Sequence, residues 1–198
     1  MSSEKKDTRD RILEATWRLM EKHCGQNVRM SDIAKAANVS RQAVYLHFES
    51  RTELMIATTR YVDEVKGLDE RLKLLQTTKN GTELLEAVIE VWGNYIPEIY
   101  GIAKALLATQ DTDEATATAW NGCMRGLRDT CEDAINTLHN EDMLASEWSI
   151  DEAIQLFWTA LSVHNWEQLT IECGWSTPQY VERTKTFLNR ALIDQSKK

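Results

Sequence analysis

The stretch Ser31–Leu54, SDIAKAANVSRQAVYLHFESRTEL, decides the fold of this chain. Its first part, Asp32–Ala37, places apolar and small residues on one helical face. Asn38 then tolerates a left-handed backbone, and Ser40 has the side chain of a helix N-cap. The pattern predicts two short helices that meet at a tight turn, followed by a third helix that begins near Ser50.

The second short helix, which follows Ser40, has an inner and an outer set of residues. Ala43, Val44 and Phe48 are spaced to pack inward. A helix of about seven residues is too short to be stable alone in water, so neighbouring helices must hold it in place. We therefore expect its outer face to bind a partner. Arg and Gln near its start can pair with base edges in the major groove of DNA, and Tyr and His farther along suit phosphates. These outer residues are Arg41, Gln42, Tyr45 and His47.

The third helix carries a cation where a helix does not favour one. Ser50 and Glu53 have the spacing of a capping box, which places Arg51 in the first turn. The helix dipole is positive at this end, so we expect Arg51 to have an anion to meet.

With these residues in place, the stretch resembles the DNA-binding domain of the TetR family of bacterial transcriptional regulators. The family pattern "IA..A.VS....Y.HF.s...L" is matched by nine residues: Ile33, Ala34, Ala37, Val39, Ser40, Tyr45, His47, Phe48 and Leu54. Asn38 replaces the usual Gly, Arg51 the usual Lys, and Arg29 a frequent Thr or Ser, so that Arg29 either reaches a phosphate or is solvated. The predicted DNA-binding residues are Arg29, Ser40, Arg41, Gln42, Ala43, Tyr45, His47 and Arg51.

Composition indicates an all-α protein. The 198 residues are 42% hydrophobic, enough to bury the core of one or two domains, and only two prolines and eight glycines interrupt helix formation. No apolar run approaches the ~18 residues of a membrane span. The opening MSSEKKDTRD contains no apolar segment typical of a signal peptide, so we expect a cytoplasmic protein.

Charge is segregated along the chain. Residues 1–51 carry ten Lys and Arg against seven Asp and Glu, and the other residues carry 13 against 24. DNA would attract the first segment and repel the second. Basic residues also precede or open the first helix, where they contact phosphates or form a solvated tail: Lys5, Lys6, Arg9 and Arg11.

Neither metal binding, a cofactor nor catalysis is indicated. The four cysteines lack CxxC spacing and a nearby His, so we expect buried free thiols rather than a zinc site, a disulfide or a redox switch. No phosphate-binding glycine loop, nucleophile elbow or HExxH motif occurs, and the protein is predicted not to be an enzyme. The cysteines are Cys24, Cys123, Cys131 and Cys173.

The whole chain predicts about nine helices in two domains, a DNA-binding helix-turn-helix domain (1–51) and a ligand-binding and dimerisation domain (52–198). After the helix-turn-helix, the fourth helix is predicted to run from 50 to 67, with an end at 75 as the alternative. Pro97 ends the fifth helix and opens the sixth, to 110; the last three helices cover 113–139, 149–174 and 177–192. In the family the last two long helices pair with those of a second subunit, so we expect a homodimer through these helices.

The chain contains seven tryptophans, and four of them lie on the predicted helices that enclose the effector cavity in the family: Trp92, Trp120, Trp158 and Trp166. Each indole could instead fill the core or the dimer interface. Together, aromatic walls and a few polar groups predict an apolar or aromatic small molecule, with no membrane partner. The predicted ligand-binding residues are Trp92, Tyr95, Trp120, Met124, Trp158, Asn165 and Trp166.

The resemblance thus implies a dimeric repressor that a small effector releases from a palindromic operator. The alternative is a dimeric DNA-binding regulator that a protein partner or thiol oxidation controls, with no small-molecule pocket.

Overall fold

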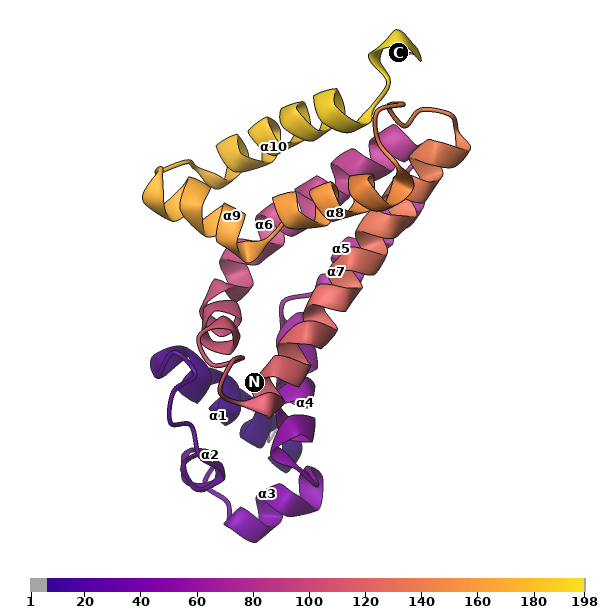
Figure 1. Ribbon diagram of the computed structural model, residues 1–198. Helices are drawn as coiled ribbons and strands as arrows, with labels where there is room; N and C mark the ends of the chain where they lie inside the picture. Colours follow the sequence, from indigo (N-terminus) through magenta and orange to yellow (C-terminus); the bar gives the residue numbers. More distant parts are fainter. Residues whose placement is uncertain (1–6, 198) are drawn as a thin grey trace, which may run out of the picture. The chain divides into compact units, whose positions relative to one another are not determined.

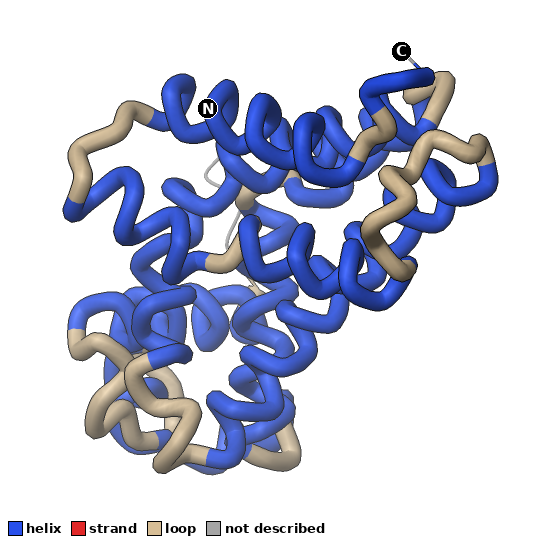
Figure 2. Tube along the Cα trace, turned by 45° about the horizontal axis from the view of Figure 1, so that its top comes forward, coloured by secondary structure: helices blue, strands red, loops and turns tan. Residues whose placement is uncertain are grey.

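The computed structural model describes residues 7–197, which form helices joined by loops (Figure 1, Figure 2). One isolated bridge, between Leu144 and Ile193, is the only β pairing in this range. The prediction of an all-α fold is therefore confirmed. Ten α-helices occur among the described residues: α1 (Thr8–Lys22), α2 (Met30–Ala36), α3 (Arg41–His47), α4 (Arg51–Val65), α5 (Leu68–Lys73), α6 (Gly81–Leu107), α7 (Glu114–Asn140), α8 (Ile150–Ala160), α9 (Val163–Glu167) and α10 (Thr177–Leu192).

Helix α6 differs from the prediction at Pro97. We expected a helix end there, but Gly81–Leu107 is one continuous helix with Pro97 inside it. An interior proline costs about 3 kcal/mol because it removes a hydrogen bond and crowds the preceding turn. Pro97 is itself exposed, whereas the helix buries a large apolar surface on both sides of it. Tertiary packing therefore outweighs the local signal.

Two other predicted helices end earlier than expected. The fourth stops at Val65 because Gly67 adopts a left-handed conformation (φ 67°), and the short α5 follows. The predicted helix 149–174 is interrupted at Ser162, whose side chain accepts a hydrogen bond from the Asn165 N–H and so caps α9. These two breaks and the fusion at Pro97 account for ten helices instead of nine.

The chain divides into two compact units. The head unit comprises Met1–Lys66 and Ile99–Cys123, and the body unit comprises Gly67–Glu98 and Met124–Lys198. Helices α6 and α7 each contribute residues to both units. The domain boundary predicted between residues 51 and 52 stays a prediction.

The head unit has one apolar core. Residues of α1, α2, α3 and α4 fill it, joined by the C-terminal turns of α6 and the first turns of α7. Side chains almost fully removed from solvent include Ile12, Ile33, Val44, Phe48 and Leu54. This packing holds the short α2 and α3, which would not be stable in isolation.

The body unit packs α10 against α6 and α8. Tyr180 and Leu188 of α10 are fully buried. Polar pairs flank this core, since the Lys185 Nζ lies 2.6 Å from the Glu90 carboxylate and the Asn189 Nδ2 lies 2.6 Å from that of Glu86. The Ser149–Glu152 capping box at the start of α8 is present as predicted.

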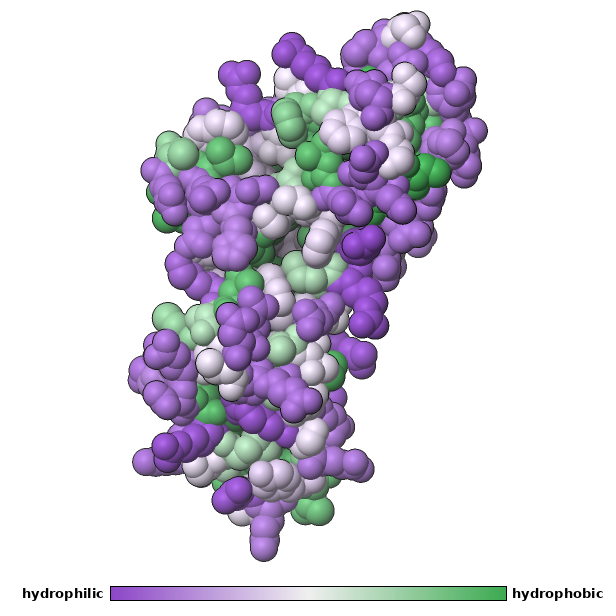
Figure 3. Space-filling model, in the orientation of Figure 1, coloured by the Kyte–Doolittle hydropathy of each residue, from purple (hydrophilic) through white to green (hydrophobic). Residues whose placement is uncertain are grey.

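Surface properties fit a helical protein with a charged exterior. On the face drawn in Figure 3, hydrophilic side chains predominate and hydrophobic ones occur in separate patches. Across residues 7–197, no helix is both long and apolar enough to span a membrane.

The prediction of buried thiols holds for Cys131, and Cys123 is half-buried, but the prediction is wrong for Cys24 and Cys173, which are exposed. Cys24 lies in the loop after α1 and Cys173 in the loop after the π-helical turn Gln168–Glu172. Both positions follow the end of a helix, where apolar periodicity no longer predicts burial.

Candidate DNA-binding site

The turn between α2 and α3 has the geometry that the sequence predicts. Asn38 adopts a left-handed conformation (φ 55°), and the Val39 N–H donates to the Ala34 carbonyl at 3.0 Å. The Ser40 Oγ then accepts from the Ala43 N–H at 3.0 Å and caps α3. Local residues therefore define the angle at which α3 leaves α2.

Helix α3 presents its polar residues to solvent. Val44 and the C-cap Phe48 are buried and anchor it, and Ala43 is half-buried. The outer set is exposed, and so is Leu46, which is 86% exposed and which the sequence did not single out. The exposed residues of this helix are Arg41, Gln42, Tyr45, Leu46 and His47.

Arg41 and Tyr45 lie together on the outer surface of α3. The Arg41 guanidinium carbon is 5.7 Å from the Tyr45 ring centroid, a cation–π arrangement one turn apart. Such a contact restricts a side chain that would otherwise sample many rotamers, and it leaves the guanidinium fork available to an acceptor. The helix can therefore offer a partly ordered bidentate donor to a groove.

The start of α2 is capped by a carboxylate. The Asp32 Oδ2 accepts from the Arg29 N–H at 3.3 Å, while the Arg29 side chain stays exposed. At the start of α4 the Ser50 Oγ accepts from the Glu53 N–H, but the Glu53 carboxylate accepts from the Glu49 N–H instead of that of Ser50. The predicted capping box is thus shifted by one residue.

Arg51 has an anion partner within the chain. Its Nε and Nη2 donate to the Asp113 Oδ2 at 3.0 and 2.7 Å, and its Nη1 donates to the Val28 carbonyl at 2.7 Å. Burial by itself would raise the pKa of Asp113, but the hydrogen bonds and charge of Arg51 hold this pKa below its ordinary value. Asp113 lies 62 residues away, so no local pattern could indicate this pair.

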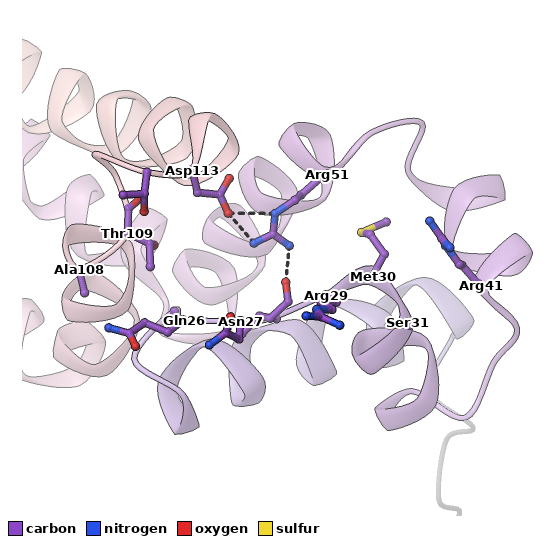
Figure 4. A pocket seen from close by; sticks show the side chains of 13 residues that line it. Gln26, Asn27, Arg29, Met30, Ser31, Arg41, Arg51, Ala108, Thr109 and Asp113 are labelled. Carbon is purple, nitrogen blue, oxygen red and sulfur yellow. Dashed lines mark hydrogen bonds and ion pairs between the residues drawn. The ribbon is translucent and has the colours of Figure 1, made fainter.

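A polar pocket of about 950 Å³ surrounds this pair. In Figure 4, Arg51 lies between Asp113 and the segment that contains Asn27, and Arg41 lies at the far end. Three of the predicted DNA-binding arginines line this single depression: Arg29, Arg41 and Arg51.

Two of the four basic residues at the start of the chain, Arg9 and Arg11, make contacts within the head unit. Lys5 and Lys6 lie outside the described residues. The Arg9 guanidinium carbon is 5.3 Å from the Phe48 ring centroid, and the Arg11 Nη2 donates to the Thr8 Oγ1 at 3.2 Å. Arg9 therefore lies next to the end of α3.

Of the predicted ligand-binding residues, the structure brings two into direct contact. The rings of Trp92 and Tyr95 meet edge to face at 5.6 Å between centroids, and both are buried. Across the described residues, the buried Trp92 Nε1 has no hydrogen-bond acceptor. A buried donor left unsatisfied is costly, so this N–H is a place where a ligand atom would be favourable.

The other predicted ligand-binding residues are dispersed. Trp166 is buried in α9, and the Asn165 Nδ2 donates to the Thr159 carbonyl at 2.7 Å. Trp158 is half-buried beneath Arg128, Met124 is half-buried, and Trp120 packs against the head-unit core. Within the described residues, no group of three or more His, Cys, Asp and Glu side chains could hold a metal ion.

Comparison with known proteins connects these features to a family. The sequence profile of "Bacterial regulatory proteins, tetR family" matches residues 12–58, which include α2, α3 and the start of α4. A nucleoid occlusion factor SlmA from Marinomonas sp. (strain MWYL1) is 26% identical over 109 residues, 54% of each protein. The chain therefore spans about half the length of that relative.

Two solved structures share the fold along nearly the whole chain. A TetR-family transcriptional regulator from Rhodococcus sp. has a TM-score of 0.75 at 17% identity, covering 94% of this chain and 99% of that one. A transcriptional regulator from Saccharomonospora viridis, in complex with choline, has a TM-score of 0.74 at 19% identity, covering 94% and 98%. At these identities the likeness concerns the fold alone. Together with the profile match over the helix-turn-helix, it leads to one conclusion: residues 12–58 form a DNA-binding domain of the tetR family of bacterial regulatory proteins, and the chain has the fold of a TetR-family transcriptional regulator.

Proposed function

We propose that this regulator is a homodimeric repressor that a small apolar or aromatic effector releases from a palindromic operator. The observation that carries the proposal is the outer surface of α3, where polar side chains are exposed on a short helix that two buried residues anchor. Members of this family act as regulators and not as enzymes. We place the protein in the cytoplasm, where its DNA would be.

On DNA, α3 would enter the major groove with its N-terminal residues toward the bases. Arg41 and Gln42 read base edges, because their side chains can pair bidentately with guanine and adenine. Phosphates, which position the helix without reading sequence, are held by the residues around it. These supporting residues are Arg29, Ser40, Ala43, Tyr45 and His47, with Ala43 contributing only its backbone.

The homodimer is proposed to form through the last two predicted helices, 149–174, which contains α8, α9 and the π-helical turn, and 177–192, which is α10. A single α3 offers little affinity, whereas a two-fold dimer contacts two half-sites about 34–36 Å apart. Two exposed apolar side chains in these segments support this surface. Phe187 of α10 is 56% exposed, and Ile171 of the π-helical turn between α9 and α10 is 60% exposed.

The effector site is proposed to lie in the body unit around Trp92 and Tyr95, with Met124, Trp158, Asn165 and Trp166 as further candidates. The remaining residue of the predicted set, Trp120, packs against the head-unit core. The free Trp92 N–H would give an apolar ligand one directional hydrogen bond. Release then requires that the ligand bind the two states of the dimer with different affinity. Choline, which the Saccharomonospora viridis structure contains, is a contrasting probe: it is a cation that aromatic faces attract, and its binding would argue against a purely apolar or aromatic effector.

The alternative, control by a protein partner or by thiol oxidation, has less support. Burial raises the pKa of Cys123 to about 11, with the charge of Asp63 adding to the effect. Burial likewise raises the pKa of Cys131 well above its usual value. Because the thiolate is the reactive form, neither thiol is suited to sensing oxidants. A thiol switch would have to use Cys24 or Cys173, and a Cys24→Ser/Cys173→Ser variant would abolish it.

Selection of DNA from a random-sequence pool tests the proposed function. The purified protein should enrich an inverted repeat and bind it with one dimer per duplex. Addition of a screened effector should then release the duplex. Enrichment of no sequence, or enrichment of a single asymmetric half-site by a monomer, would contradict the proposal.

A further inference from the structure

The loop between α1 and α2, residues 23–29, is attached at two points to the α6–α7 corner, which comprises the last turns of α6, residues 108–113 and the first turn of α7. The first is Gly25, which has a left-handed φ of 74° and at which any Cβ would collide with the Ala105 carbonyl oxygen. Only glycine fits this approach to α6. The loop backbone therefore lies directly on the last turns of α6.

The second attachment is the Arg51–Asp113 pair. Arg51 holds the loop through the Val28 carbonyl and holds the α6–α7 corner through Asp113 (Figure 4). Its side chain is 27% exposed and that of Asp113 is 25% exposed, so water competes only partly for these hydrogen bonds. One guanidinium therefore joins the start of α4, the loop before α2 and the start of α7.

Asp113 uses both carboxylate oxygens in this arrangement. While Oδ2 accepts from Arg51, Oδ1 accepts from the Ala115 N–H at 3.0 Å at the beginning of α7. The adjoining corner is also ordered, since the Thr109 Oγ1 is 3.2 Å from the Thr116 Oγ1. A movement of the first turn of α7 would thus move the carboxylate that Arg51 contacts.

These contacts lie immediately before the DNA-binding helices. Val28 precedes the first residue of α2 by two positions, and α3 follows α2 after one tight turn. Helices α6 and α7 continue from this corner into the body unit. The Arg51 side chain is already committed to acceptors within the chain, and so it is not free to serve mainly as a phosphate ligand.

We propose that Arg51 and Asp113 form a clamp that positions α2 and α3 for DNA, and that Asp113 is the positioning residue through which the α6–α7 corner acts on them. This inference rests on the proposed function. It assigns Arg51 a role that differs from the phosphate contact predicted from sequence, since the anion that Arg51 meets is the Asp113 carboxylate.

The first test measures affinity for a duplex selected by the wild-type protein and for a scrambled duplex, over a range of salt concentration. We expect Asp113→Asn and Arg51→Gln each to weaken binding to the selected duplex roughly tenfold, and the double variant to lose no more than either single one. The salt dependence should match that of the wild type, because no phosphate contact is removed. Asparagine can still cap α7, so the fold should persist.

Two further variants serve as controls. Asp111→Asn removes an exposed carboxylate from the same loop and should leave affinity within about twofold. Asp113→Glu restores the negative charge and should recover part of the loss. The clamp is refuted if Asp113→Asn tightens binding while Arg51→Gln lowers the salt slope by about 1, the result expected when Arg51 holds a phosphate. Additive losses would refute it as well.

A second measurement needs no DNA and separates the clamp from the proposed function. Amide hydrogen exchange of residues 23–29 should become faster in Asp113→Asn and Arg51→Gln, but not in Asp111→Asn. Unchanged exchange would contradict the clamp whatever the DNA result. Faster exchange in a protein that selects no DNA sequence would support the clamp and count against the proposed function.

Discussion

The head unit and the body unit place their candidate functional residues in opposite environments. On α3, Arg41 and Gln42 are exposed, and buried residues of the same helix hold it in place. In the body unit, Tyr95 is fully buried and Trp92 is nearly so. The head can therefore change what it binds without losing its core, whereas in the body a change of ligand-binding residue is also a change of core residue.

The largest expected effect lies in the body unit. Tyr95→Ala removes a fully buried aromatic ring that packs against Trp92, and we expect it to lower the free energy of unfolding by about 3–5 kcal/mol. Denaturant unfolding measures the change. Leu74→Ala, at an exposed apolar residue of the same unit, should stay within about 0.5 kcal/mol. Equal effects of the two substitutions would contradict the view that Tyr95 is part of the core.

The second effect concerns the head unit and should leave stability unchanged. Gln42→Ala is expected to weaken binding to the selected duplex by roughly 1–3 kcal/mol, because a base contact is lost, while binding to a scrambled duplex stays the same. Fluorescence anisotropy with both duplexes measures the difference. An equal loss on all DNA would remove Gln42 from the base-reading set.

A smaller effect is expected at the cap of α3. Ser40→Ala removes the acceptor for the Ala43 N–H and should cost about 1 kcal/mol of stability, whereas Ser40→Asn should retain most of it. Thermal unfolding of the three proteins measures this order. If Ser40→Asn proves as unstable as Ser40→Ala, the hydroxyl has a role other than capping.

The smallest effect is the pH dependence of the Arg51–Asp113 pair. The pKa of Asp113 is lowered in the folded protein, so the pair stabilises the protein above the unfolded carboxyl pKa of about 3.9. This stabilisation is lost as the pH falls through the lower, folded value. The stability difference between the wild type and Asp113→Asn should therefore be constant near neutral pH and shrink below about pH 4. A difference that persists in acid would assign it to the α7 cap instead.

The features that the sequence predicted correctly depend on neighbouring residues. The turn at Asn38, the cap at Ser40 and the inner and outer faces of α3 each follow from residues within a few positions. The sequence also expected an anion near Arg51, but the partner lies 62 residues away, beyond any local pattern. The predicted helix end at Pro97 was wrong for a similar reason. Burial of the rest of α6 outweighs the effect of a local helix-breaking residue. The helix break at Ser162 did have a local cause, because the Ser162 side chain accepts a hydrogen bond from the Asn165 N–H and caps α9. The apolar periodicity on both sides of Ser162 instead favoured one continuous helix.

The central claim is that α3 reads a DNA sequence, and one titration tests it most directly. The purified protein is titrated into the DNA that flanks its own gene over a range of salt concentration, with a scrambled duplex as the control. The account predicts saturable binding of one dimer to an inverted repeat, tighter than to the scrambled duplex at every salt concentration. The account would be contradicted if the protein bound both duplexes equally and salt abolished this binding, because contacts to phosphates alone produce that result.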